Sequence, residues 1–203
     1  MRLGLFGGTF DPIHVGHLIL AEQCREACGL DRVWLVVANE PPHKMGAKRT
    51  GVNHRLEMAR LAVAGNPAFE VSDLEAHRPG PSYSVDTLDL VRAERPGDDL
   101  FFLIGGDSLV DLPSWREPGR IARMATIVVA NRPGSNPETP PASLFGPDAL
   151  PLRHVEIPPI GVSSSDLRRR MAEGRSIRYM VPRPVEAYID AHKLYRQPPA
   201  PSS

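Results

Sequence analysis

The stretch that decides the fold is residues 3–20, LGLFGGTFDPIHVGHLIL. Its first four residues form a short apolar run, which is typical of a strand buried on both faces. Gly7 and Gly8 follow; glycines adopt backbone conformations closed to other residues, and they let a ligand approach the main chain closely. His14 and His17 begin the next predicted helix, and their spacing of three places both imidazoles on one face of its first turn. A glycine-rich turn leading into a helix N-terminus is a favourable place to hold phosphate.

The rest of the chain repeats this alternation of strand and helix. Helices are predicted at about residues 13–28 and 84–94, with another between a cap at Asn53 and a stop at Gly65. Strands are predicted at residues 3–6, 32–38, 70–74, 100–104, 126–130 and 154–157. This order predicts an α/β fold with a doubly wound parallel sheet. Such a sheet binds ligands outside the carboxyl ends of its strands, which here are followed by residues 7–8, 39–44 and 105–107.

Length and composition indicate one domain. The 203 residues, 41% of them hydrophobic, are enough for a substantial core. We expect residues 1–196 to form this domain and residues 197–203 to be a disordered tail. Residues 131–151 are rich in proline, glycine and serine, which predicts an irregular surface loop.

Charge and hydropathy exclude several classes of partner. Lysine plus arginine and aspartate plus glutamate both number 24, so no global field favours nucleic acid or an anionic membrane. The longest apolar runs are too short to span a bilayer, and the first residues lack the layout of a signal peptide. Cys24 and Cys28, four residues apart, fall on the apolar stripe of a predicted helix and are interpreted as buried thiols. A cytoplasmic protein in a reducing compartment is expected.

The histidine pair allows more than one interpretation from the residues alone. A metal site would need a third histidine or a carboxylate on the same face, which Val15 and Gly16 do not supply, so no metal is assigned to the protein. Gly16 is a poor helix former, costing up to about 1 kcal/mol against alanine. We therefore expect another group to pack where its side chain would lie.

A basic run between His43 and Arg55 has a simple interpretation as a solvated surface. Lys44 is the exception. It follows the predicted strand end and the stiff Pro41-Pro42 pair, so it is assigned to substrate phosphates.

The segment GGTFDPIHVGH, residues 7–17, resembles the first signature of the nucleotidyltransferase superfamily, whose H-x-G-H histidines hold the phosphates of ATP. Other segments resemble motifs of the bacterial nicotinate-nucleotide adenylyltransferase family within it, and in the same order. They are PPHK (41–44), SYSVDTL (82–88), GGDSL (105–109), SW (114–115), VSSSDLRRR (162–170) and VPRPVEAYIDAHKLY (181–195). Val162, where isoleucine is expected, is a small departure. Together these motifs cover nearly the whole chain and are highly specific.

This resemblance implies a Rossmann-like nucleotidyltransferase fold with a small C-terminal helical part. It also implies a reaction in which ATP and nicotinate mononucleotide give deamido-NAD and pyrophosphate, in NAD biosynthesis, with Mg²⁺ bound to the ATP phosphates. The attacking phosphate is already an anion, so alignment and charge stabilisation are needed rather than a strong base. His14 and His17 are expected to be the catalytic groups, donating to the α- and β-phosphate oxygens.

The resemblance also assigns the remaining site residues. For ATP they are Gly7, Gly8, Thr9, Gly105, Asp107, Ser164, Ser165 and Arg168, together with the two histidines. For nicotinate mononucleotide they are Lys44, Tyr83, Ser84, Val85, Thr87 and Trp115. Simpler structural roles are also open: a helix cap for Asp107 and the serines, and core packing for Tyr83 and Trp115.

Two other functions remain open at this point. A pantetheine-phosphate adenylyltransferase would use the histidine pair but would leave SYSVDTL and the Trp115 segment without a role. A non-catalytic nucleotide sensor on the same fold would not need groups that stabilise a transition state. Small-molecule substrates are the expected partners, and neither a monomer nor a homo-oligomer is excluded.

Overall fold

A computed structural model describes residues 1–41, 49–131, 134 and 140–196. Its centre is a six-stranded sheet with the order β3-β2-β1-β4-β5-β6, in which every pair of neighbours is parallel. The strands are β1 (Arg2–Gly8), β2 (Arg32–Val37), β3 (Phe69–Ser72), β4 (Asp99–Gly105), β5 (Thr126–Asn131) and β6 (Arg153–Glu156). This is the doubly wound order of nucleotide-binding folds. The chain adds β2 and β3 on one side of β1 and then adds β4, β5 and β6 on the other side, so the switch point lies between β1 and β4. The predicted fold class is confirmed.

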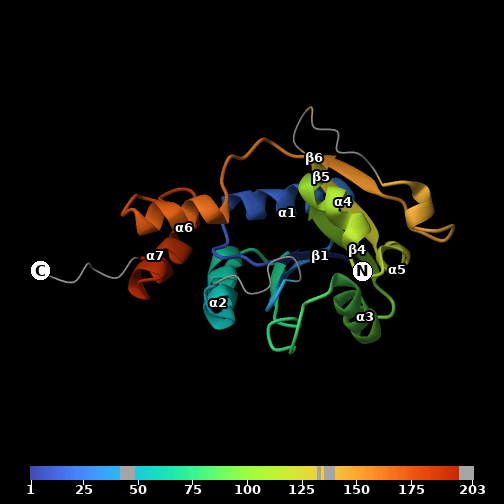
Figure 1. Cartoon of the computed structure of the whole chain (residues 1–203), viewed down its shortest axis with the longest axis horizontal. Helices are drawn as coiled ribbons and strands as arrows, with labels where there is room; N and C mark the ends of the chain where they lie inside the picture. Colours follow the sequence, from blue (N-terminus) through green and yellow to red (C-terminus); the bar gives the residue numbers. More distant parts are fainter. Residues whose placement is uncertain (42–48, 132–133, 135–139, 197–203) are drawn as a thin grey trace, which may run out of the picture.

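Helices cover both faces of the sheet (Figure 1). They are α1 (Val15–Cys28), α2 (Val52–Val63), α3 (Ser84–Glu94), α4 (Gly106–Asp111), α5 (Pro118–Met124), α6 (Ser164–Ala172) and α7 (Arg183–Ala191), with short 3₁₀ turns at Leu112–Ser114 and Ala142–Leu144. Alternate residues of β4 enter opposite layers: Phe101 and Leu103 pack with α1, α2, α6 and α7, whereas Phe102 packs with α3, α4 and α5. The four central strands β2, β1, β4 and β5 therefore contribute to both cores, whereas β3 and β6 contribute to the first one only.

The helix boundaries test the sequence prediction directly. The predicted limits of α3, residues 84–94, are confirmed. The first helix begins two residues later than predicted, because His14 has extended backbone angles and acts as its N-cap. Asn53 is not a cap, since α2 already begins at Val52 after Gly51. Gly65 lies just beyond the end of α2 with φ +87°, as the stop signal requires.

Several smaller features complete the fold. Cys24 and Cys28 are free and buried, as expected from their stripe. Helices α4 and α5 were not predicted, and the predicted loop at residues 131–151 contains a 3₁₀ turn within its described part. No helix among the described residues is long and apolar enough to cross a membrane. The predicted tail, residues 197–203, lies outside the described residues.

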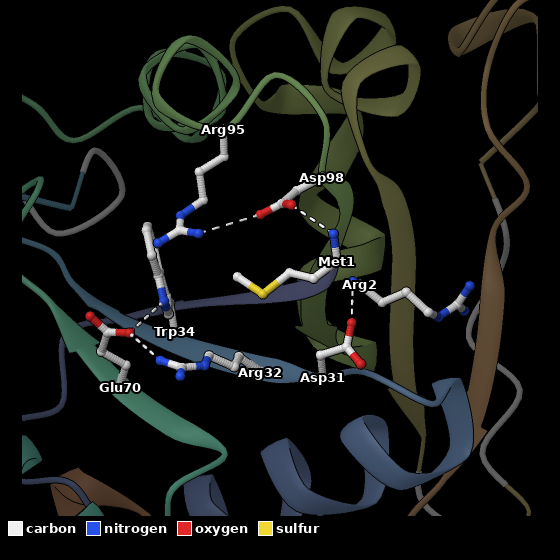
Figure 2. A network of polar contacts seen from close by, with 8 residues as sticks. All are labelled: Met1, Arg2, Asp31, Arg32, Trp34, Glu70, Arg95 and Asp98. Atoms are coloured by element: carbon white, nitrogen blue, oxygen red, sulfur yellow. Dashed lines mark hydrogen bonds and ion pairs between the residues drawn. The ribbon is translucent and has the colours of Figure 1, made fainter.

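A polar network links the amino ends of the strands (Figure 2). The amino group of Met1 lies 2.7 Å from Asp98, and Arg95 lies 3.7 Å from the same carboxylate. The Arg95 guanidinium also sits 5.0 Å above the ring of Trp34, whose indole N–H donates to Glu70 at 3.1 Å. The network therefore lies at the amino ends of the strands, opposite the carboxyl ends where the glycines Gly7 and Gly105 lie. The carboxyl ends of the strands, where such sheets bind ligands, are not part of this network.

Candidate functional site

One pocket of about 500 Å³ opens at the carboxyl ends of β1 and β4. Segments far apart in the sequence form its wall, because the carboxyl ends of parallel strands meet at one edge of the sheet. Most of the predicted residues line it: Gly7, Gly8, Thr9, His17, Tyr83, Ser84, Thr87, Gly105, Trp115, Ser164 and Arg168. The predicted ATP groups and the predicted pyridine groups thus share a single cavity.

The other predicted residues lie outside this lining. Val85 is fully buried in the core under α3, which leaves only its backbone N–H for a ligand. Asp107 is exposed in the first turn of α4, and the Ser165 hydroxyl pairs with that of Ser163 at 3.1 Å. His14 is buried behind His17. Lys44 lies outside the described residues.

The two glycines that follow the predicted first strand only partly fill the roles expected of them. Both belong to β1, and neither has a positive φ angle, so no special backbone conformation is used. A Cβ atom on Gly8 would lie 2.7 Å from Cζ of Phe10, so the Phe10 ring excludes a side chain there. A Cβ atom on Gly7 would meet nothing within 4 Å, and this residue lines the pocket. Of the two, Gly7 alone has open space at the position of the missing side chain.

His14 and His17 form a compact stacked pair at the start of α1. Their ring centroids are 3.7 Å apart with an interplanar angle of 24°. The backbone N–H of His14 donates to Nδ1 of His17 at 3.2 Å. A neutral His17 therefore carries its proton on Nε2, which makes that nitrogen a hydrogen-bond donor. Since His17 lines the pocket, this donor is suited to a phosphate oxygen.

Gly16 is explained by this stacking. A Cβ atom at Gly16 would lie 3.0 Å from Nδ1 of His14, so the His14 ring occupies the space of the missing side chain. The expected packing is confirmed. The helix N-terminus itself is less open than predicted, because the N–H of Val15 donates to the carbonyl of Met180 at 3.0 Å. The imidazole and the preceding turn remain as the donors that face the pocket.

Burial lowers the pKa of His14 to about 4. The residue is only 6% exposed, and its Nδ1 has no hydrogen-bond partner among the described residues. His14 is therefore neutral at pH 7, and no charge repulsion opposes its stacking on His17.

The buried neutral His14 predicts a pH-dependent stability. The unfolded chain takes up a proton near pH 6.5, whereas the folded chain does so only near pH 4. The contribution of His14 to the free energy of unfolding is thus constant above pH 6.5, and it decreases as the pH falls from 6.5 to 4. Each pKa unit corresponds to about 1.4 kcal/mol, so the loss should reach up to about 3 kcal/mol. Urea unfolding at pH 7, 5.5 and 4 would measure it. A His14→Gln variant should lack this component, and equal pH slopes in the two proteins would contradict the assignment.

Three buried charged residues at or beside the pocket were not predicted: Asp11, Arg55 and Glu75, the last of which is described below. Asp11 is 4% exposed and lines the pocket, and its carboxylate accepts hydrogen bonds from the Tyr195 hydroxyl (2.6 Å) and the Thr50 N–H (3.3 Å). Arg55, counted above with a solvated surface, is instead 2% exposed. Its guanidinium donates to the backbone carbonyls of Thr9, Ala38, Asn39 and Thr50. Arg55 thereby joins the ends of β1 and β2 to the segment before α2.

Helix α6 is fastened to the turn before α1. Ser163 caps the helix by accepting the N–H of Asp166 at 3.2 Å, which is the structural role considered above. The Ser164 hydroxyl donates to the carbonyl of Pro12 at 3.0 Å, and Arg168 donates to that of Asp11 at 2.7 Å. Arg168 thus stands at the pocket with further guanidinium donors for a ligand.

The other half of the pocket is aromatic. Trp115 packs edge-on against Phe102, with centroids 6.0 Å apart, and also lines the cavity, so it combines the two roles considered for it. The Arg116 guanidinium lies 4.9 Å from the ring centre of Tyr83 and lines the pocket too. This arginine was not predicted, because its position after Trp115 gives no periodic signal. The aromatic half therefore carries a cation.

Two carboxyl groups line the pocket, and both are engaged. Asp11 has the partners described above, and Glu75 accepts a hydrogen bond from the Thr87 hydroxyl. Burial raises the pKa of Glu75. Among the described residues, no group of three or more histidine, cysteine, aspartate or glutamate side chains could hold a metal ion.

This sheet order, with a pocket at its switch point, defines a doubly wound α/β protein of the nucleotide-binding class. Residues 5–170 match a family model described as cytidylyltransferase-like. A probable nicotinate-nucleotide adenylyltransferase of Thermomicrobium roseum is 51% identical over 196 residues, covering 96% of this chain and 92% of the relative. Another, from a strain of Thermus thermophilus, is 50% identical, covering 97% of this chain and 100% of the relative. The chain belongs to the nicotinate-nucleotide adenylyltransferase family.

Solved structures agree on the fold. The nicotinic acid mononucleotide adenylyltransferase of Plasmodium falciparum, complexed with NaAD, superposes with a TM-score of 0.77 at 19% identity, covering 96% of this chain and 97% of that one. A putative nicotinate-nucleotide adenylyltransferase of Vibrio parahaemolyticus gives a TM-score of 0.71 at 18% identity, covering 98% of each chain.

Proposed function

We propose that the protein joins ATP and nicotinate mononucleotide to give deamido-NAD and pyrophosphate, as a step of NAD biosynthesis. The observation that carries this is the single pocket, in which His17 and Arg168 stand on one side and Tyr83 and Trp115 on the other. The polar side suits a triphosphate, and the aromatic side suits a pyridine ring. The names of the relatives at about 50% identity support the same reaction.

The chemistry requires a new bond between a phosphate oxygen of the mononucleotide and the α-phosphorus of ATP. The bond from this phosphorus to the oxygen that bridges to the β-phosphate breaks, and pyrophosphate leaves with the electron pair. No proton has to be removed from the nucleophile. The protein therefore acts by aligning two anions and by stabilising charge on the transferring group.

The residues of the pocket divide this work. Gly7 allows the triphosphate to approach the end of β1, and Nε2 of His17 donates to an oxygen whose charge grows in the transition state. We assign Arg168 to the β- and γ-phosphates, for which its planar guanidinium is suited. Tyr83 and Trp115 are assigned to the two faces of the pyridine ring. His14 supports His17 by stacking.

Mg²⁺ is expected to arrive with ATP rather than to be held by protein ligands. Both carboxyl groups of the pocket are engaged in hydrogen bonds, so the ion's ligands would be triphosphate oxygens and water, which this hard cation prefers. EDTA should abolish activity, and added Mg²⁺ should restore it. Metal analysis of the purified protein provides the opposing outcome: tightly bound zinc would make His14 and His17 metal ligands.

Pyrophosphate release tests the proposed reaction. The enzyme should release pyrophosphate from ATP in the presence of nicotinate mononucleotide, but not with phosphopantetheine or with ATP alone. Release with phosphopantetheine would identify a pantetheine-phosphate adenylyltransferase. Nucleotide binding without release under any of these conditions would identify a nucleotide sensor.

A further inference from the structure

The C-terminal motif at residues 181–195 has been given no role in the proposed reaction, yet its last residue contacts the pocket residue Asp11. The Tyr195 hydroxyl donates to Oδ1 of Asp11 at 2.6 Å, across 184 positions of sequence. Burial, together with this hydrogen bond, raises the pKa of Tyr195, so the hydroxyl remains a protonated donor. Asp11 lines the pocket directly before the start of α1.

The turn that contains Asp11 depends on outside support. Phe10 has a φ angle of 49°, in the left-handed region that bulky residues rarely occupy. Such a conformation persists only where the surrounding structure holds it. The Phe10 ring packs edge-on against His17, with centroids 5.1 Å apart. Any relaxation of the turn would therefore also move Phe10, which contacts His17, the residue proposed to bind a phosphate oxygen.

Most of the contacts that hold this turn come from segments beside the pocket. Arg55 and Arg168 bind the carbonyls of Thr9 and Asp11. The Asp11 carboxylate is different, because the shorter of the two hydrogen bonds described for it comes from Tyr195, beyond α7. Without this hydroxyl, a carboxylate in a residue only 4% exposed would keep the 3.3 Å bond to the Thr50 N–H. A buried charge that loses a donor is expected to shift or to admit water.

On the basis of the function proposed above, we propose that Tyr195 is a positioning residue for the nucleotide site. Its hydroxyl holds Asp11, and through Asp11 it holds the turn of residues 9–12 that faces the ATP phosphates. Because Arg168 is bonded to the same turn, both sides of the triphosphate site depend on this contact. The aromatic half of the pocket, built on α3 and Trp115, does not depend on it.

The test is a pair of matched substitutions, Tyr195→Phe and Tyr188→Phe. Both tyrosines belong to the C-terminal motif, both are half-buried, and both hydroxyls are hydrogen-bonded; that of Tyr188 pairs with Nδ1 of His54 at 2.9 Å, away from the pocket. Loss of one hydrogen bond to a charged group should weaken binding of a non-hydrolysable ATP analogue about tenfold or more in Tyr195→Phe. KM for nicotinate mononucleotide should change less than about twofold, and Tyr188→Phe should leave both constants unchanged.

Calorimetric titration of the full-length variants, below both melting temperatures, gives the affinities. In an Asp11→Ala background, which removes the carboxylate that accepts this hydrogen bond, Tyr195→Phe should have no further effect on ATP affinity. Wild-type affinity in Tyr195→Phe, or equal weakening in Tyr188→Phe, would overturn the assignment. Because the analogue is titrated alone, failure of the wild type to adenylylate nicotinate mononucleotide would contradict the proposed function without affecting this result.

Discussion

The His17→Ala variant is expected to have a kcat about 100- to 1,000-fold below that of the wild type, with KM for ATP little changed. Removal of one preorganised donor to a developing charge costs about 2.7–4 kcal/mol of transition-state stabilisation. In this protein the donor is preorganised in two ways: the His14 N–H fixes the tautomer of His17, and the His14 ring fixes its plane. An interaction made mainly in the transition state lowers kcat rather than substrate affinity.

Steady-state kinetics with saturating nicotinate mononucleotide would measure this loss. His154→Ala is a suitable control, because His154 pairs with Asn131 on strands β5 and β6 and does not line the pocket. A folded His17→Ala protein with wild-type kcat would remove His17 from the mechanism. The double variant with His14→Ala should lose less than the sum of the two single losses, because His14 is proposed to act through His17.

The second large effect is a preference for nicotinate mononucleotide over nicotinamide mononucleotide of at least about tenfold to a hundredfold in kcat/KM, since an unpaired buried polar group costs about 1–3 kcal/mol. Tyr83 is the N-cap of α3 but makes no side-chain cap hydrogen bond, and Ser84 lines the pocket. The first N–H groups of this helix suit a carboxylate. An amide would place its own N–H₂ donors against them.

Arg116 strengthens this expectation. Its guanidinium lies above Tyr83 and places a cation beside the predicted position of the acid group, although the carboxylates of Asp86 and Glu117 each lie 3.7 Å from it. The required comparison is kcat/KM for the two mononucleotides under identical conditions. Equal values would mean that the start of α3 does not face the ring substituent, and that the enzyme accepts both substrates.

The sequence predicted those features of the fold that depend on residues close together in the chain. The limits of α3 and the alternation of strands follow from hydrophobic periodicity, and parallel pairing then brings distant strand ends together. The contacts of Gly8 could not be found in this way, because the ring that requires glycine there is placed by tertiary packing. Arg55 was assigned to a surface for the same reason. A basic side chain in a charged run carries no local sign that four backbone carbonyls surround it.

The contact between Asp11 and Tyr195 also has a consequence for the order in which the molecule is made. Strand β1 leaves the ribosome before the other five strands and becomes a central strand once β2 and β4 have paired with it. The turn that follows β1 receives its last support only when residue 195 has emerged. A nascent or prematurely terminated chain can thus build much of the sheet while its nucleotide site is unfinished. The nucleotide site therefore receives this support only after all six strands of the sheet have been made.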